Sequence, residues 1–180
     1  MKKVNQFIVL FLIFNFFGYA QSVKFGVKAG LNYANVTGSE IKTDAITNFH
    51  AGIVSEINLT KGLAFQPELI YSTQGATYKT ATEDFKNDLG YITIPVILKI
   101  SLSDSLMLEL GPQAGFLLSE KNKFDAQKTN TFDFTANVGL GLKITQNLFA
   151  DARYGLGLTE IKTDSKIKNS VLQLSLGILF

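Results

Sequence analysis

His50 is the only histidine in this 180-residue chain and the residue best suited to act as a catalytic base. A catalytic base must lie within hydrogen-bond reach of a nucleophile and of a group that orients its ring. The nearest candidates along the sequence are Ser55, Ser72 and Glu56. In an extended strand, Ser55 points away from the side that His50 and Glu56 share. The pattern favours a histidine inside the folded domain or at its rim, and we predict that the chain is not an enzyme.

Metal and cofactor sites have equally little support in the sequence. One histidine and no cysteine are too few ligands for a typical zinc site. The Gly-Leu-Gly-Leu segments at Gly139–Leu142 and Gly155–Leu158 lack the helix that must follow a phosphate-binding loop. Loop carboxylates could hold divalent cations at a lipopolysaccharide surface, but solvated charges are the simpler interpretation of Glu40, Asp44, Glu83, Asp84, Asp88, Asp125 and Asp164. We therefore predict no cofactor and no metal site.

The segments that carry these residues alternate apolar and polar side chains with period two, which is the pattern of a β-strand with two different faces. In the last segment, Leu172, Leu174 and Leu176 share one face with Ile178 and the terminal Phe180. The alternation recurs and predicts eight strands, near Val23–Tyr33, Asn48–Leu59, Leu63–Gln74, Tyr91–Ile100, Leu106–Phe116, Phe132–Lys143, Leu148–Thr159 and Val171–Phe180.

The connections between these segments also alternate, between short and long. Short turns are expected at Thr60–Gly62, Leu102–Asp104 and Thr145–Asn147. Longer polar loops are expected near 37–47, 79–88, 120–130 and 161–168. An odd number of turn residues keeps the apolar face in phase, and the third position of such turns favours a left-handed backbone, here at Gly62, Asp104 and Asn147. Short turns at one rim and long loops at the other, with both chain ends on the short-turn rim, are typical of an outer-membrane barrel.

Three prolines lie inside the predicted strands, although a closed barrel has no free edge to accommodate them. The register implied by the turn at Leu102–Asp104 places Pro95 opposite Gly111 or Gln113, next to Pro112. We therefore predict a shared bulge or bend at this pair of prolines.

The polar face decides whether the apolar side chains point outward into lipid or inward, as in a soluble lipocalin-like barrel. That face combines charges of both signs with many glycines, which would make room for long side chains in a narrow eight-stranded lumen. We predict that the apolar face meets lipid and that a lumen charge network comprises Lys24, Lys28, Glu56, Glu68, Lys99, Glu109, Asp133, Lys143, Asp151 and Arg153.

Two ion pairs are expected within that network, because the short turns make Lys99–Glu109 and Lys143–Asp151 diagonal neighbours. Aromatic side chains are expected as girdles at both membrane interfaces. Those near the short-turn rim are Phe25, Phe65 and Phe180, and those toward the other rim are Tyr33, Phe49, Phe116, Phe132 and Phe134.

The first 20 residues have the features of a cleaved secretory signal peptide. Lys2 and Lys3 precede an apolar run from Phe7 to Phe17, and small residues precede the expected cut after Ala20. Residues 21–180 would then form one outer-membrane barrel domain. The absence of cysteine excludes a lipid-anchored precursor. Removal of the two lysines leaves 15 basic and 15 acidic residues, so nucleic acid is not an expected partner.

Four segments together resemble the PorT-like outer-membrane β-barrel family of Bacteroidetes. They are Val23–Asn32 (Val-Lys-Phe-Gly-Val-Lys-Ala-Gly-Leu-Asn), Tyr91–Lys99, Leu110–Phe116 and Ala152–Thr159. The Tyr-x-x-Ile-Pro and Gly-Pro-x-x-Gly patterns carry the resemblance in combination. It implies an outer-membrane barrel, generally without an assigned activity, and recognition of the terminal Phe180 by the barrel-assembly machinery.

The leading functional hypothesis is an eight-stranded, up-and-down transmembrane barrel in the outer membrane, with a structural or protein-interaction role through its outer loops. Its expected partners are outer-membrane lipid and the barrel-assembly machinery. Three alternatives remain open: an accessory component of protein secretion or envelope assembly, a small-solute or ion pore, and a periplasmic lipocalin-like binder.

Overall fold

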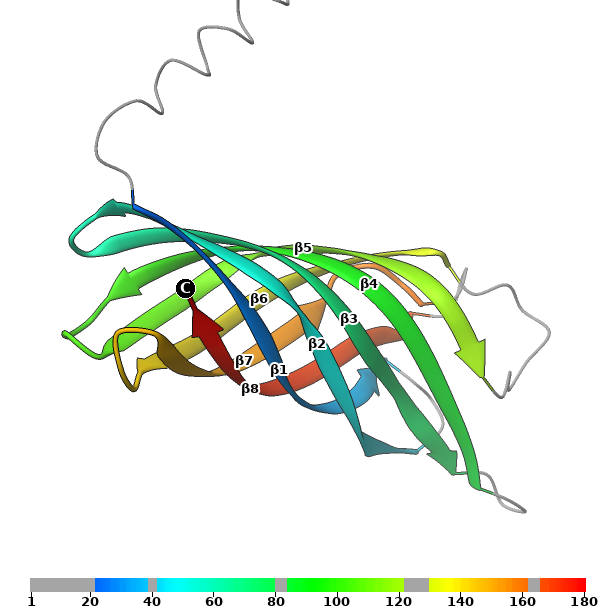
Figure 1. Cartoon of the computed structure of the whole chain (residues 1–180). Coiled ribbons are helices and arrows are strands. Elements are labelled where there is room, and N and C mark those ends of the chain that lie inside the picture. The colour runs from blue at the N-terminus through cyan, green and yellow to red at the C-terminus, as the bar shows by residue number, and fades with distance from the viewer. Residues whose placement is uncertain (1–21, 39–41, 80–83, 122–129, 162–165) are drawn as a thin grey trace, which may run out of the picture.

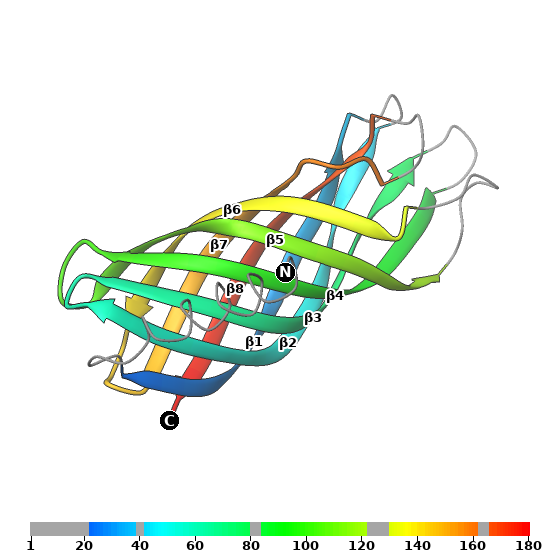
Figure 2. The same ribbon diagram turned by 90° about the horizontal axis from the view of Figure 1, so that it is seen from above.

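The computed structural model describes residues 22–38, 42–79, 84–121, 130–161 and 166–180. These residues form eight strands: β1 (Val23–Thr37), β2 (Thr43–Thr60), β3 (Leu63–Lys79), β4 (Asp84–Ser101), β5 (Leu106–Lys121), β6 (Phe132–Lys143), β7 (Leu148–Gly157) and β8 (Lys168–Leu179). Each strand pairs antiparallel with the next, and β8 pairs with β1 to close a barrel (Figures 1 and 2). The predicted fold class is confirmed. Within the described ranges, no helix has the length and apolar character needed to span a bilayer.

The pairing of β8 with β1 closes the barrel and fixes the position of the C-terminal strand. The pairing of β1 with β8 runs from Gly26–Leu179 to Thr37–Lys168 without a shift of register. The terminal Phe180 also donates its backbone N–H to the carbonyl of Phe25 at 2.7 Å. The start of β1, the end of β8 and the three short turns all lie at one end of the barrel, on the left in Figure 1.

The short turns keep the apolar face in phase, but only one has the predicted residues. Between β2 and β3 the turn consists of Lys61 and Gly62 alone. A register shift between Asn58 and Thr60 adds the odd residue that keeps the apolar side chains of both strands on the same face. Between β4 and β5 the closing backbone hydrogen bond joins Leu102 to Leu106, so the turn is centred one residue later than expected. Between β6 and β7 the bond from Ile144 to Leu148 encloses Thr145–Asn147, as predicted.

The expectation of left-handed residues in these turns was wrong, because none of Gly62, Asp104 and Asn147 has a positive φ. A hydroxyl group stabilises each turn instead. The side-chain oxygens of Thr60, Ser103 and Thr145 each accept a hydrogen bond from the backbone N–H two residues later. Serine and threonine hydroxyls stabilise such turns without requiring a positive φ.

The prolines interrupt the ladder of strand pairs without shifting its register, so of the predicted bulge or bend at Pro95 and Pro112 the bulge is absent. The register shift between β4 and β5 lies at Gly90 and Tyr91 instead. Each proline lacks a partner on one neighbouring strand, because proline has no N–H to donate. Each keeps a partner on the other neighbouring strand, in the pairs Pro67–Val96, Pro95–Gln113 and Pro112–Ala136.

The outer surface of the barrel is apolar and its interior is polar. Phe25, Leu174 and Leu176 are 65%, 54% and 59% exposed, whereas the side chains of Lys99 and Arg153 are buried inside. This arrangement contradicts the lipocalin-like alternative, in which the apolar face would line the interior. Of the aromatic side chains expected at the two ends of the barrel, all but the half-buried Phe65 are exposed. The rings of Phe116 and Phe132 pack against each other, and Phe49 packs against Tyr71, which was not among the expected residues.

Apolar side chains also fill parts of the interior, which the sequence pattern did not predict. Toward the long-loop rim, one cluster contains Val36, Ala76, Tyr78, Leu89, Tyr91 and Ile161. Toward the short-turn rim, a second cluster contains Val54, Ile70, Phe149 and Leu179.

Candidate functional site

Arg153 on β7 is the centre of a buried charge network. Its guanidinium donates two hydrogen bonds to Glu68 on β3, at 3.0 and 3.2 Å. It also donates to one oxygen of Glu109 on β5, from Nη2 at 2.7 Å and from Nε at 3.1 Å. All three side chains are essentially inaccessible to solvent. The planar guanidinium therefore joins two carboxylates that would each be costly to bury alone.

Lys28 extends the network on the side of β1. Its ammonium lies 2.9 Å from Asp151 and 3.5 Å from Glu68, so it bridges a carboxylate on β7 to one on β3. Oδ1 of Asp151 also lies 2.9 Å from the hydroxyl oxygen of Ser175 on β8. Pairing of this kind is what buried charges require in a narrow interior.

Lys99 extends the network toward the short-turn rim. Its ammonium donates to Glu56 on β2 at 2.9 Å and to Gln66 on β3 at 2.8 Å, and lies 3.8 Å from Glu109. Lys99 and Glu109 are direct partners across the β4–β5 ladder rather than diagonal neighbours. Cations and carboxylates thus alternate in the order Asp151, Lys28, Glu68, Arg153, Glu109, Lys99 and Glu56.

The other predicted members of the network lie apart from this chain of ion pairs. The expected pair Lys143–Asp151 is wrong: Asp151 binds Lys28, and Lys143 lies exposed opposite Phe149 at the short-turn rim. Lys24 is half-buried at the same rim and donates to the carbonyl of Gln146 at 3.3 Å. Asp133 is buried toward the other rim, where it accepts hydrogen bonds from the hydroxyls of Thr135 and Thr159.

His50 lies at the end of the network, among residues that the sequence pattern did not single out. Its Nδ1 atom is 2.7 Å from Oδ1 of Asn32, and its Nε2 atom is 2.9 Å from Oγ of Ser175. The order serine, histidine, asparagine resembles a nucleophilic triad. All three residues are buried, with exposures of 5% or less, so a substrate has no access to them. In the sequence, the only sign that these three residues lie close together is that each occupies a position on the polar face of its strand.

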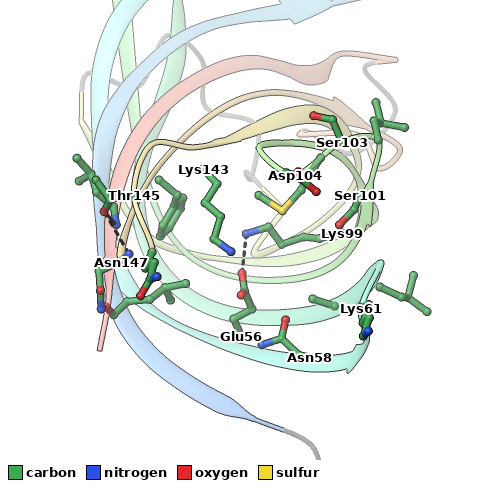
Figure 3. Close-up of a pocket in the computed structure, with 18 of the residues that line it drawn as sticks. Glu56, Asn58, Lys61, Lys99, Ser101, Ser103, Asp104, Lys143, Thr145 and Asn147 are labelled. Atoms are coloured by element: carbon green, nitrogen blue, oxygen red, sulfur yellow. Dashed lines mark hydrogen bonds and ion pairs between the residues drawn. The ribbon is translucent and has the colours of Figure 1, made fainter.

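A cavity opens at the short-turn rim, next to Lys99. We call it the mouth cavity; its volume is about 380 Å³, and its wall includes the turns at Thr60–Lys61, Leu102–Asp104 and Thr145–Asn147 (Figure 3). Lys99, Glu56 and Phe149 lie at its inner end, where the ammonium of Lys99 is 4.9 Å from the centre of the Phe149 ring. Lys99 is 1% exposed, so the cavity ends at the ion pairs and does not continue through the lumen.

The terminal Phe180 lies on the outer surface of the short-turn rim, where it is 72% exposed. In the described part of the chain, no three histidine, cysteine or acidic side chains lie close enough to hold a metal ion.

Comparison with known proteins gives three results. The family model described as "Outer membrane protein beta-barrel domain" matches residues 19–163. None of the curated proteins compared with the chain matches it. Solved structures of similar fold include Ail, the attachment invasion locus protein of Yersinia pestis, with 13% identity and a TM-score of 0.57 over 87% of this chain and 98% of Ail.

Two further structures have the same fold. Neisserial surface protein A is 15% identical, with a TM-score of 0.55 over 90% of this chain and 100% of that protein. The outer membrane protein OprG from Pseudomonas aeruginosa is 11% identical, with a TM-score of 0.51 over 89% of this chain and 97% of OprG.

Proposed function

The chain belongs to the outer membrane protein β-barrel domain family and resides in the outer membrane, and on this premise we propose that it is a closed, non-enzymatic barrel with a structural or protein-interaction role. The barrel holds the protein in lipid through its apolar outer surface. The connections at the rim opposite the short turns, 38–42, 80–83, 122–131 and 158–167, would supply the segments that meet partners.

The observation that carries this proposal is the chain of ion pairs across the lumen. Glu68, Glu109 and Arg153 have side-chain exposures of 1% or less, and they join strands on different sides of the barrel. An eight-stranded barrel is just wide enough for its interior to be filled by side chains. A solute would have to break several buried ion pairs to pass, which disfavours the pore alternative.

Single-channel recording in planar bilayers tests the closed state. Purified, refolded protein should insert without producing conductance steps. Regular steps from the wild-type protein would favour the small-solute pore and contradict the closed barrel. The variant Arg153→Ala, which removes the central side chain, serves to show that conductance would be detected if the lumen were open.

Cross-linking in living cells tests the interaction role. Replacement of residues 122–129 by a glycine-serine linker should abolish cross-links between the protein and its neighbours, while the barrel still migrates anomalously before boiling. A change at the opposite rim, such as Lys61→Gln, should leave the cross-links intact. If the cross-links survive the loop replacement, this loop is not the interaction surface.

An accessory role in secretion or envelope assembly is the second candidate. Tyr91–Lys99 and Leu110–Phe116 resemble the PorT-like family of Bacteroidetes, one named member of which participates in protein secretion, but the short loops of this chain give no reason to transfer that role. Co-purification of the detergent-solubilised protein with a secretion complex would favour this role. Purification without partners after mild cross-linking would exclude it.

We also propose how the chain reaches its membrane. Residues 1–20, which lie outside the described residues, would be removed as a signal peptide, and the barrel-assembly machinery would recognise Phe180. N-terminal sequencing of the mature protein should begin at Gln21. Phe180→Ser should reduce the amount of assembled barrel in cells without changing the stability of barrels refolded in detergent.

A further inference from the structure

Lysine side chains converge on the mouth cavity, which faces the periplasm because short turns lie on that side of outer-membrane barrels. Lys61, Lys99 and Lys143 line the cavity, against the carboxylates of Glu56 and Asp104. Figure 3 shows Lys143 extending into the cavity, with its ammonium directed toward Lys99 and Glu56. Glu56 already accepts a hydrogen bond from Lys99 at 2.9 Å. Three lysines against two carboxylates give the wall of the cavity a net positive charge.

Two hydroxyl groups add donors on opposite sides of the cavity. Ser103 and Thr145 occupy equivalent positions in the turns after β4 and β6, and Figure 3 places them at opposite edges. Each hydroxyl oxygen accepts two backbone N–H groups of its own turn, at distances of 2.9 to 3.4 Å. Because the oxygen acts as an acceptor in these bonds, the hydroxyl hydrogen can still be donated to a ligand.

The cavity is larger than an inorganic ion requires and is partly apolar. Its volume of about 380 Å³ lies in the range of small-molecule sites. Ala64, Met107, Phe149 and Leu179 contribute apolar surface to its wall. A ligand that fits this lining would have a small organic body and one oxygen-rich anionic group.

We propose that the mouth cavity binds small organic oxyanions from the periplasm, such as phosphomonoesters. Lys143 binds the anionic group, and the hydroxyl of Ser103 or of Thr145, whichever lies on the same side of the cavity, donates to one of its oxygens. The organic body packs against the more accessible apolar part of the wall, which includes Met107 and Leu148. The ligand binds without passing through, because the cavity ends at the buried ion pairs of Lys99. This site lies at the rim opposite the outer loops and does not depend on their proposed role.

Titration calorimetry of the whole refolded barrel in a zwitterionic detergent tests the proposal, with glycerol 3-phosphate as the probe. Saturable binding to one site is expected at low salt. Lys143→Gln should weaken this binding by about tenfold, the loss expected when one charge-assisted hydrogen bond is removed. Lys143→Arg, which keeps the charge, should retain most of the affinity.

Matched controls distinguish binding at a specific site from nonspecific electrostatic attraction. Lys168→Gln removes a lysine at the start of β8, near the opposite rim, and should leave the affinity unchanged. Uncharged glycerol should not bind, and inorganic phosphate should bind more weakly than glycerol 3-phosphate because it lacks an organic body. The proposal is overturned if the wild-type barrel shows no saturable binding at millimolar glycerol 3-phosphate. It is also overturned if Lys143→Gln and Lys168→Gln lose affinity equally. Equal binding of glycerol or of inorganic phosphate would also contradict it.

Discussion

Arg153 and Glu68 lie 85 residues apart in the sequence and form a two-point contact in the barrel interior, with hydrogen bonds of 3.0 and 3.2 Å. The same guanidinium binds Glu109 on the other side at 2.7 Å. One side chain therefore neutralises two carboxylates that have no contact with solvent. Lysine could not reproduce this arrangement, because its ammonium lacks the planar fork of donors.

Replacement of Arg153 by methionine should destabilise the barrel strongly. The variant leaves Glu68 without its two-point partner, and the loss of one member of a buried pair typically costs about 3–5 kcal/mol. Equilibrium unfolding by urea in phospholipid vesicles would measure the change.

A double-mutant cycle tests the electrostatic origin of that loss. Arg153→Met combined with Glu68→Gln removes one charge of each sign, so the double variant should be more stable than the sum of the two single losses predicts. Strict additivity would show that the two residues are not coupled.

The ring of His50 should carry a proton on Nδ1. That atom lies 2.7 Å from Oδ1 of Asn32, whose amide nitrogen already donates to Ser72 and to the carbonyl of Thr73. An acceptor oxygen this close requires a donor on the ring. In the neutral ring Nε2 is then an acceptor, so the hydroxyl hydrogen of Ser175 is directed to Nε2 rather than to Asp151. Because His50 is the only histidine, nitrogen NMR of histidine-labelled protein gives one pair of ring signals to assign. An unprotonated Nδ1 at neutral pH would contradict this network. In Asn32→Ala, the ring should no longer favour the tautomer with the proton on Nδ1.

Gly177 leaves the space that the ring of Phe149 fills. A Cβ atom at this position would lie only 2.2 Å from the ring, and the ring also packs against the ammonium of Lys99. Gly177→Ala should therefore destabilise the barrel by about 1–3 kcal/mol, as overpacking usually does. Gly62→Ala is the matched control, because a Cβ there meets nothing within 4 Å. Combining Gly177→Ala with Phe149→Leu should recover part of the loss, measured by the same urea unfolding.

The sequence predicted which way most strand residues face, because a period of two admits only two choices and the charges distinguish them. Arg153 and Glu109 could thus be placed inside from alternation and charge alone. Their partners could not, because a contact across the lumen depends on the tilt and stagger of the strands and not on ladder neighbours alone. Lys143 and Asp151 illustrate the limit: they lie near each other along the hairpin, yet Asp151 reaches across to Lys28.

The interior apolar clusters could not be predicted for a different reason. Phe149 and Ile70 point inward from strands whose outward residues are also apolar, so alternation gives no contrast at these positions. The turns differ in detail because Thr60 and Ser103 stabilise them through hydroxyl groups. Glycine or asparagine in the third position favours a left-handed backbone, but a hydroxyl at the start of a turn removes that requirement.

A charge on the outer face should be costly in the middle of β8 and tolerated at the rim. Leu174 is 54% exposed on the outer surface and pairs with Leu31 and Ala152 on its two sides. Leu174→Arg should therefore cost about 2–4 kcal/mol in phospholipid vesicles, the value typical of the bilayer midplane. Leu102 is similarly exposed, at 56%, but lies beside the short turn after β4, where Leu102→Arg should cost only about 0–1 kcal/mol. If water rather than lipid covered this face, both substitutions would be nearly neutral, so equal small effects would refute the lipid-facing orientation of the apolar side chains.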